Sequence, residues 1–300
     1  MYRAYDPVLD RQVALKIPRH EFNEDKKMRR FVREAKAAAS LHHPNIVAVF
    51  ESGQLDGELF IASEFVDGTP MSLRLQDNRP SLRQAAEWVS ALAEGLAYAH
   101  EFGIVHRDIK PDNIMISRAD QPRIMDFGLA KRLNEDSSMT AEGGVLGTPA
   151  YMAPEQARGD LDQVGPRSDQ YSLGVVLYEL LTGQRPFSGP AHSVIAQVIK
   201  ENPVEPRRIR PDIPVDLAAI CGKAMEKQPE RRYPNTKEMA DDLEKWLAGR
   251  ETLARPIGRA ERVIRWSRAN PVVAAMTGIT AALVVLVAVV SVRFPPAGAD

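Results

Sequence analysis

The sequence is poor in cysteine, with Cys221 the single thiol among 300 residues. One thiol cannot build a disulfide framework or a zinc site with several thiolate ligands, and it suits a reducing compartment. A lone cysteine is usually buried, so a structural position is predicted for Cys221. The start of the chain also lacks a secretory signal, because residues 1–20 carry scattered charges and no apolar run.

Neither sign of charge dominates the sequence. The 39 lysines and arginines nearly balance the 40 aspartates and glutamates, which leaves a net charge of −1. This balance gives no general argument for a nucleic-acid partner, and none is expected. Hydrophobic residues at 44% and charged residues at 26% are ordinary for a globular protein, and the length allows one large domain or two smaller ones.

One long apolar run is present near the end of the chain. Residues 272–292 contain no charge and consist mostly of Val, Ala, Leu and Ile. At about 1.5 Å per residue, a helix of this length spans about 30 Å, the hydrocarbon thickness of a bilayer. A buried core helix is the alternative, but the run shows no polar face. A transmembrane helix over 272–292 is therefore predicted.

The charges on the two sides of this run indicate its orientation. Six arginines precede it within residues 250–268, whereas Arg293 is the single basic residue after it. Because the flank richer in Lys and Arg stays cytoplasmic, the preceding domain is expected on the cytoplasmic side of the cell membrane. The basic run either contacts anionic lipid head groups or is a solvated linker that only sets the topology.

Turn residues and hydrophobic periodicity predict an α+β fold class, with a β-rich part before a larger helical part. Residues 2–17 indicate two strands around a turn, and strands are also predicted at 46–50 and 59–66. A helix at 24–41 is expected to end before Pro44, and the pattern turns helical after Gly68. Further helices are predicted at 81–103, with Ser81 as N-cap, and at 170–181, 192–200, 215–225 and 236–248.

Four short motifs follow one another along the chain. They are Val-Ala-Leu-Lys at 13–16, a segment beginning His-Arg-Asp at 106–113, Asp-Phe-Gly at 126–128 and Ala-Pro-Glu at 153–155. Each alone is weak, but in this order and at these spacings they resemble the signatures of the protein kinase family. The resemblance covers about residues 2–247 and implies a bilobal kinase fold. The domains expected are a small lobe at 1–67, a large lobe at 68–249, a basic linker at 250–271, the membrane helix at 272–292 and a tail at 293–300.

The resemblance assigns the chemistry of phosphoryl transfer to particular residues. Asp108 is implied to accept or orient the proton of the attacking hydroxyl, and Lys110 to bring a positive charge beside the transferring group. Asn113 and Asp126 offer hard oxygen ligands, which suit Mg²⁺. The implied cofactors are therefore ATP and Mg²⁺.

The implied nucleotide site lies at the junction of the two lobes. Lys16 is implied to bind the α- and β-phosphates, with Glu34 as the opposite charge that fixes it. Ser63 falls at the gatekeeper position, where many relatives carry a bulkier residue, so a back pocket is expected to be open. The implied adenine contacts are the carbonyl of Glu64, the N–H of Val66 and the side chains of Ala14 and Met115.

Substrate class follows from the loop around the catalytic aspartate. In the family, a lysine two places after that aspartate, here Lys110, accompanies serine/threonine specificity, so protein Ser and Thr hydroxyls are the implied substrates. Thr148 is placed to hydrogen-bond near this lysine. Asp169 resembles the family's buried anchor for the catalytic loop, and Arg232 is placed to pair with Glu155.

Regulation by phosphorylation is a further expectation. In relatives an arginine before the catalytic aspartate, here Arg107, often pairs with a phosphate in the activation loop. Ser137, Ser138 and Thr140 lie in that loop and are the candidate acceptors, the alternative being ordinary solvated side chains. Activation by dimerisation is common in such relatives, so a homodimer is left open.

The glycine-rich loop, which the family places one strand before the lysine, is absent. The chain begins with Met1 about where that motif should have just finished. One interpretation is a misplaced start, with a valine codon read as initiator. The chain is then a membrane-anchored serine/threonine kinase of the bacterial receptor type. The alternative is a truncated pseudokinase that acts as a binding or scaffold module. A small-molecule kinase has weaker support, because the Ala-Pro-Glu segment suits a protein substrate.

Overall fold

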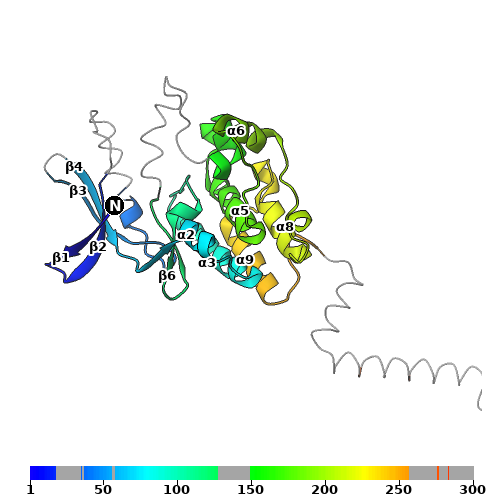
Figure 1. The fold of residues 1–300 in the computed structure, drawn as a ribbon, viewed down its shortest axis with the longest axis horizontal. Coiled ribbons are helices and arrows are strands. Elements are labelled where there is room, and N and C mark those ends of the chain that lie inside the picture. Colours follow the sequence, from blue (N-terminus) through cyan, green and yellow to red (C-terminus); the bar gives the residue numbers. More distant parts are fainter. Residues whose placement is uncertain are drawn as a thin grey trace, which may run out of the picture. The chain divides into compact units, whose positions relative to one another are not determined.

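The computed structural model describes residues 1–17, 35, 37–55, 58–127, 149–256, 276 and 283 (Figure 1). The chain divides into two compact units, Met1–Ala254 and Arg255–Asp300. The first unit contains a small β-rich lobe and a larger, mainly helical lobe, which is the bilobal arrangement implied by the resemblance. The unit extends to Ala254, past residue 249, where the large lobe is expected to end.

The small lobe is built on a four-stranded antiparallel sheet. Its strands are β1 (Tyr2–Asp6), β2 (Arg11–Lys16), β3 (Val49–Leu55) and β4 (Glu58–Glu64), in the order β1-β2-β4-β3. Asp6 closes the first turn, because its Oδ1 accepts from the N–H groups of Val8 and Leu9, each at 3.1 Å. The predicted pair of strands around a turn in residues 2–17 is confirmed.

The strand predicted at 46–50 has the wrong bounds. The strand begins at Val49, and Ile46 instead forms an isolated parallel bridge with Ile124 of the large lobe. The Val47 N–H donates to the Ile124 carbonyl at 2.9 Å, and the Ile124 N–H donates to the Asn45 carbonyl at 2.8 Å. The backbone groups of residues 45–47 therefore form hydrogen bonds between the two lobes and do not extend the sheet.

The helix expected at 24–41 lies mostly outside the described residues. Ala35 and residues 37–39 are helical, and a turn follows at Ser40. The Ser40 hydroxyl donates to the Ala37 carbonyl at 2.7 Å, which satisfies one of the carbonyls left open at the helix end. The helix thus ends before Pro44, as predicted.

A second sheet of three short strands was missed by the sequence pattern. Strands β5 (Gly68–Pro70), β6 (Ile114–Ser117) and β7 (Pro122–Ile124) pair antiparallel in that order. The approach of β5 to β6 needs a glycine, because a Cβ on Gly68 would lie 2.2 Å from the Ile116 carbonyl oxygen. The prediction that the chain turns helical after Gly68 is wrong at these strands, which are too short to show an alternating pattern.

Helices form the rest of the large lobe. Helix α3 (Leu82–Glu101) begins at the predicted N-cap, since the Ser81 Oγ accepts from the Gln84 N–H at 3.1 Å. Helices α6 (Ala191–Lys200), α8 (Val215–Ala224) and α9 (Thr236–Leu247) lie close to their predicted bounds, whereas α2 (Met71–Asp77), α4 (Pro154–Arg158) and α7 (Pro206–Ile209) were not predicted.

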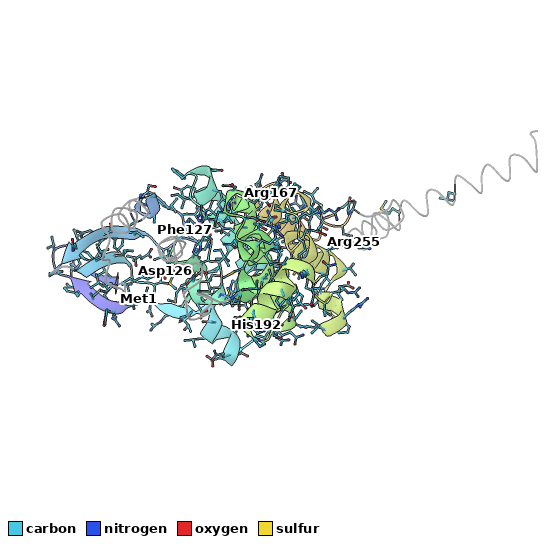
Figure 2. All side chains as sticks on the ribbon, turned by 90° about the horizontal axis from the view of Figure 1, so that it is seen from above. Met1, Asp126, Phe127, Arg167, His192 and Arg255 are labelled. Atoms are coloured by element: carbon cyan, nitrogen blue, oxygen red, sulfur yellow. The ribbon has the colours of Figure 1, made fainter. Side chains whose placement is uncertain are left out.

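Helix α5 (Pro166–Thr182) is buried along nearly its whole length and lies at the centre of the helical lobe (Figure 1). It begins earlier than the predicted residue 170, because Pro166 suits the first helical position and the Ser168 hydroxyl accepts from the Gly165 N–H at 3.2 Å. The buried apolar side chains of α5 belong to the hydrophobic core of this lobe. Figure 2 shows the side chains of the described residues on the ribbon. Because α5 is buried along nearly its whole length, its residues hold fixed positions within the lobe.

Cys221 of α8 is fully buried against α5, which confirms its predicted structural position. Its thiol donates to the Gly174 carbonyl, with a sulfur–oxygen distance of 3.6 Å. Burial raises the pKa of this thiol far above its ordinary value, because a thiolate in the core would lose its hydration. The thiol is therefore unreactive in the folded protein.

Within the described part of the chain, no helix is long and apolar enough to cross a membrane. The run predicted to span the bilayer, residues 272–292, lies outside the described residues except for Met276 and Leu283.

Candidate active site

Three predicted residues of the 106–113 segment form one hydrogen-bonded group. Lys110 Nζ lies 2.8 Å from Asp108 Oδ2. Asn113 Nδ2 donates to the same oxygen at 3.0 Å and to the Asp108 backbone carbonyl at 2.8 Å. The Asp108 carboxylate is thus held in one orientation by an ammonium group and an amide.

Asp169 of α5 fixes the backbone of this loop from below. Its Oδ2 accepts from the His106 N–H at 2.8 Å, and its Oδ1 accepts from the Arg107 N–H at 2.7 Å. His100 Nε2 lies 2.9 Å from Oδ2. Burial alone raises the pKa of Asp169, but the hydrogen bond and charge of His100, with the contacts of His106, outweigh it and hold the pKa below its ordinary value. The structure places Asp169 where the resemblance implies a buried anchor.

His106 connects the catalytic loop to the segment after β7, which carries Asp126. The Asp108 N–H donates to His106 Nδ1 at 3.2 Å, so Nδ1 is an acceptor and the ring proton resides on Nε2. Nε2 then donates to the Met125 carbonyl at 2.8 Å. The Met125 N–H in turn donates to the Asn113 carbonyl at 2.9 Å. The two segments with predicted metal ligands are therefore joined by backbone contacts.

Two residues of the site have left-handed backbone conformations. Arg107 has φ of +66° and Asp126 has φ of +60°. Such angles are uncommon outside glycine and are most costly for long side chains such as arginine. Strained conformations of this kind persist where surrounding contacts hold them and are concentrated at functional sites. Here the hydrogen bond that the Arg107 N–H donates to Asp169 supplies restraint for Arg107.

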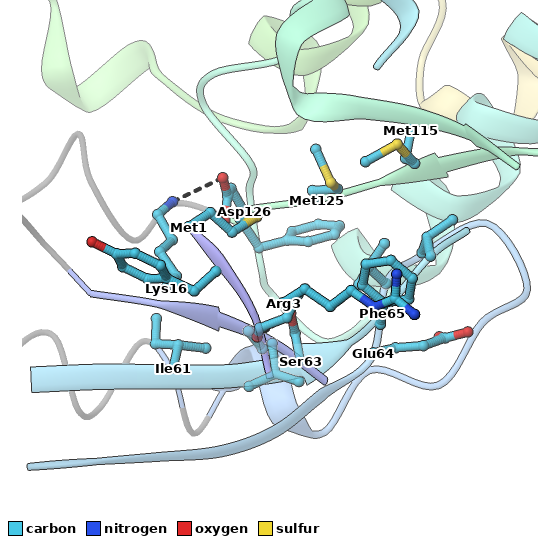
Figure 3. A pocket seen from close by; sticks show the side chains of 17 residues that line it. Met1, Arg3, Lys16, Ile61, Ser63, Glu64, Phe65, Met115, Met125 and Asp126 are labelled. Atoms are coloured by element: carbon cyan, nitrogen blue, oxygen red, sulfur yellow. Dashed lines mark hydrogen bonds and ion pairs between the residues drawn. The ribbon is translucent and has the colours of Figure 1, made fainter. Parts of the chain in front are cut away.

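Lys16 of β2 points into the cleft between the lobes and lies 2.8 Å from Asp126 Oδ2 (Figure 3). Both side chains are partly exposed, at 29% and 25%. The pair joins the small lobe to the Asp-Phe-Gly segment and places a cation beside the predicted metal ligand. Glu34, the predicted partner of Lys16, lies outside the described residues.

The donor set around Asp126 fits a divalent metal of the magnesium type. Asn113 is oriented by the two bonds that its Nδ2 donates to Asp108, which directs its amide oxygen away from that residue. One amide oxygen and one carboxylate are too few to hold Mg²⁺ alone, and this ion usually completes its shell with phosphate oxygens and water. In the described part of the chain, no cluster of three or more His, Cys, Asp or Glu side chains could hold a metal.

A cavity of 260 Å³ lies between β1, β2, β4 and the segment after β7 that carries Asp126 (Figure 3). Its walls are mostly apolar, and its charged lining residues are Arg3, Lys16, Glu64 and Asp126. All six predicted nucleotide-binding residues that the structure describes line it, namely Ala14, Lys16, Glu64, Val66, Met115 and Asp126. Sequence reasoning missed further lining residues, among them Met1, Arg3, Val47, Phe65 and Met125.

The segment after β4 forms one rim of this cavity. The Glu64 N–H donates to the Ala48 carbonyl at 2.8 Å, and its carboxylate pairs with Arg123 of β7. The Arg3 guanidinium lies over the Phe65 ring, 4.9 Å from its centroid. These contacts fix the rim at which the resemblance implies the adenine edge, and nothing in the short sequence motifs indicated the Arg3 contact.

Ser63 lines the same cavity, together with Ile61 and Phe127. Its hydroxyl donates to the Ala14 carbonyl at 3.4 Å, so the short side chain stays against β2. We expect the larger side chain of Ser63→Met to fill part of this cavity. Inhibition by bulky ATP-competitive compounds should then weaken about 10–100-fold. Ser63→Ala, which keeps the space open, is the matched control in the same dose–response measurement. Equal inhibition of the Met variant and the wild type would contradict the open back pocket.

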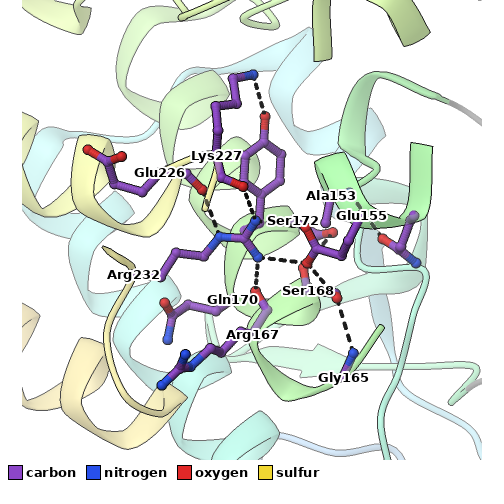
Figure 4. A network of polar contacts seen from close by, with 12 residues as sticks. Ala153, Glu155, Gly165, Arg167, Ser168, Gln170, Ser172, Glu226, Lys227 and Arg232 are labelled. Atoms are coloured by element: carbon purple, nitrogen blue, oxygen red, sulfur yellow. Dashed lines mark hydrogen bonds and ion pairs between the residues drawn. The ribbon is translucent and has the colours of Figure 1, made fainter. Parts of the chain in front are cut away.

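Glu155 of α4 and Arg232 form a fully buried, bidentate ion pair, with both N–O distances at 2.8 Å (Figure 4). Ser168 donates to Glu155 Oε1 at 2.7 Å. Burial raises the pKa of Glu155, but the hydrogen bonds and charge of Arg232 outweigh burial and bring the pKa below its ordinary value. The remaining N–H groups of Arg232 donate to the carbonyls of Arg167, Glu226 and Lys227.

Lys227 is a half-buried lysine close to that pair. Its Nζ donates to the Val198 carbonyl at 2.7 Å and lies 4.5 Å from the centre of the Phe187 ring. Burial, with a smaller effect of the Arg232 charge, lowers the pKa of Lys227 to about 8, and Glu201 opposes this shift weakly. The unfolded chain keeps this proton up to about pH 10.

This shift predicts a pH dependence of stability. Between about pH 8 and about pH 10 the unfolded state binds more protons at Lys227 than the folded state, so the free energy of unfolding rises with pH. Urea unfolding of wild type and Lys227→Met at about pH 7.5 and about pH 9.5 measures this. The wild type should gain stability relative to the variant at the higher pH. A constant difference between the two proteins would show that the lysine does not titrate in this range.

Several predicted residues lie outside the described part of the chain. They are Glu34, Ser137, Ser138, Thr140 and Thr148. Their roles, and the pairing of Arg107 with an activation-loop phosphate, stay predictions.

The protein kinase domain family matches residues 1–245. The chain belongs to this family. Serine/threonine-protein kinase PknB of Mycobacterium leprae is 43% identical over 250 residues, covering 81% of this chain and 40% of that protein. The probable serine/threonine-protein kinase SCO3848 of Streptomyces coelicolor is 42% identical over 257 residues, covering 83% and 38%. The chain therefore belongs to the eukaryotic-like serine/threonine kinases of bacteria, a family that uses ATP and a divalent metal.

Solved structures agree with this assignment. The Mycobacterium tuberculosis PknI kinase domain superposes with a TM-score of 0.65 at 29% identity, covering 81% of this chain and 89% of that one. The chain spans about 40% of the length of the curated relatives that it matches.

Proposed function

We propose that this chain transfers the γ-phosphoryl group of Mg-ATP to serine and threonine hydroxyls of proteins. The observation that carries the proposal is that two charged groups lie on adjoining segments, which are joined where the Met125 N–H donates to the Asn113 carbonyl at 2.9 Å. Asp108, Lys110 and Asn113 form one group, and the Lys16–Asp126 pair forms the other. A site of this composition can position a phosphoryl group and offset its charge, which is most of what such catalysis requires.

The chain's own residues divide the work. Asp108 accepts or orients the proton of the attacking hydroxyl, held for this by Asn113. Lys110, next to the same carboxylate, offsets negative charge that develops on the transferring group. Lys16, which lines the cavity, holds the α- and β-phosphates. Mg²⁺, held by Asn113 and Asp126 when bound, supplies positive charge to the phosphate oxygens.

The substrate class rests on Lys110 and on the relatives, whose names describe serine/threonine-protein kinases. The scaffold alternative is not favoured, because the four residues that phosphoryl transfer needs are present, in two charged groups on adjoining segments. Phosphoamino-acid analysis after incubation with labelled Mg-ATP and a generic basic protein tests the proposal. Label on Ser or Thr supports it, and label confined to Tyr, or no label on protein, would contradict it.

We further propose that residues 272–292 anchor the chain in the cell membrane, with residues 1–249 on the cytoplasmic side. The length and apolar composition of the run and the arginines before it support this. The full chain, expressed in a bacterial host, should stay in the membrane fraction after alkaline carbonate washing. A variant ending at Ala254 should leave that fraction. Extraction of the full chain by carbonate would contradict the anchor.

A further inference from the structure

The chain does not leave the large lobe where α9 ends. Residues 252–254, here called the clasp, return to the helix and are fixed by Asp242, whose side chain is fully buried. Asp242 Oδ1 accepts from the Leu253 N–H at 2.5 Å, and Oδ2 accepts from the Ala254 N–H at 2.9 Å. The clasp lies beyond residue 245, the last residue matched by the kinase domain family.

The same carboxylate contacts Tyr233, which lies shortly before the start of α9. Tyr233 is fully buried, and its hydroxyl donates to Asp242 Oδ2 at 2.8 Å. The Tyr233 N–H donates to Gln170 Oε1 at 2.9 Å, and Gln170 Nε2 donates to the Asn235 carbonyl at 3.1 Å. Gln170 directly follows Asp169 on α5. Asp242 is thus connected through buried polar contacts to the element that anchors the catalytic loop.

A second connection runs from the first residue of α9. The Thr236 hydroxyl lies 3.1 Å from His100 Nδ1, and the other ring nitrogen of His100 lies 2.9 Å from Asp169 Oδ2. That oxygen accepts the His106 N–H, next to Arg107 in the catalytic loop. A shift of α9 would therefore move His100, and His100 contacts Asp169, which anchors the catalytic loop.

We propose that Asp242 and the clasp are positioning elements for the catalytic loop, acting through α9, Gln170 and His100 on Asp169. The inference rests on the proposed phosphoryl transfer for its effect on rate. Physically, a buried carboxylate that loses two of its three donors becomes costly, so release of the clasp must shift Tyr233 and the start of α9. The loop backbone, strained at Arg107, then loses part of its restraint.

One buried residue of the clasp, Thr252, weakens its attachment to the large lobe. Thr252 is 2% exposed, and its hydroxyl has no hydrogen-bond partner among the described residues. A buried, unpaired hydroxyl opposes docking, so the clasp is held less firmly than its shape allows. Thr252→Val keeps the shape and removes the polar atom, and it should tighten the clasp. Substitutions that release the clasp and a substitution that tightens it should therefore change amide exchange in the catalytic loop in opposite directions.

The test combines hydrogen exchange of the His106 and Arg107 amides with steady-state kinetics of the full chain. Asp242→Asn should speed exchange at both amides and lower kcat about threefold to thirtyfold, with the KM for ATP unchanged. Ala254→Pro, which removes one donor outside α9, should act in the same direction and is available if the first variant folds poorly. Thr252→Val should slow exchange at the same amides.

Met239→Ala is the matched control, because Met239 is a fully buried residue of α9 outside the polar path. It should destabilise the fold without selective change at His106 and Arg107 when compared at equal distance below Tm. Equal exchange and equal kcat in Asp242→Asn and Met239→Ala would overturn the positioning role. If no variant transfers phosphate but exchange changes as stated, the positioning stands and the proposed function fails.

Discussion

Asp108→Asn should lower the rate of phosphate transfer about a hundredfold to ten-thousandfold, the usual contribution of a positioned general base. The substitution removes the carboxylate that lies 2.8 Å from Lys110. It keeps the size of the side chain, and Asn113 can still donate to the backbone carbonyl of residue 108. Single-turnover transfer from labelled Mg-ATP to a protein substrate measures the loss.

The matched measurement is nucleotide affinity. Asp108 does not line the cavity that holds Lys16, so the variant should bind ATP within about threefold of wild type. Loss of both transfer and binding would indicate a damaged fold instead of a missing base. Transfer at the wild-type rate would remove Asp108 from its proposed role.

Arg232→Met should destabilise the folded protein by about 3–5 kcal/mol, because it leaves Glu155 as a buried charge without its partner. Ser168 would remain as a donor to that carboxylate, and the three carbonyls that Arg232 now satisfies would lose their donors as well. Urea unfolding at neutral pH measures the free energy.

The double variant Glu155→Leu with Arg232→Met is the informative control. Replacing both charges by apolar side chains removes the unpaired carboxylate, so the double variant should be more stable than Arg232→Met alone. Equal destabilisation of the single and double variants would show that the lost carbonyl contacts, not the buried charge, dominate the cost.

Local chemistry made part of the fold predictable. Ser81 is an N-cap because its hydroxyl meets the Gln84 N–H, and this depends on residues three positions apart. Strands β5 to β7 escaped prediction, since each has too few residues for a period to appear. The predicted bounds of β3 are wrong, because the Val47 N–H bonds to the carbonyl of distant Ile124 instead of extending the strand.

The candidate site divides in the same way. Lys16, Asp108, Asn113 and Asp126 occur in contiguous motifs, so the sequence alone could place them. Cavity residues such as Phe65 and Met125 belong to no motif, and only the folded structure shows that they line the cavity. The contacts of Asp242 with Tyr233 and the clasp arise only in the folded chain, because they join a buried carboxylate to a tyrosine hydroxyl and to two backbone N–H groups, which no side-chain pattern marks.

The most direct test of the central claim is phosphate transfer from labelled Mg-ATP by the full chain, measured beside Asp108→Asn. The account predicts label on protein with the wild type and nearly complete loss in the variant, with ATP binding retained in both. A folded wild type that binds ATP but transfers no phosphate to any protein would contradict it.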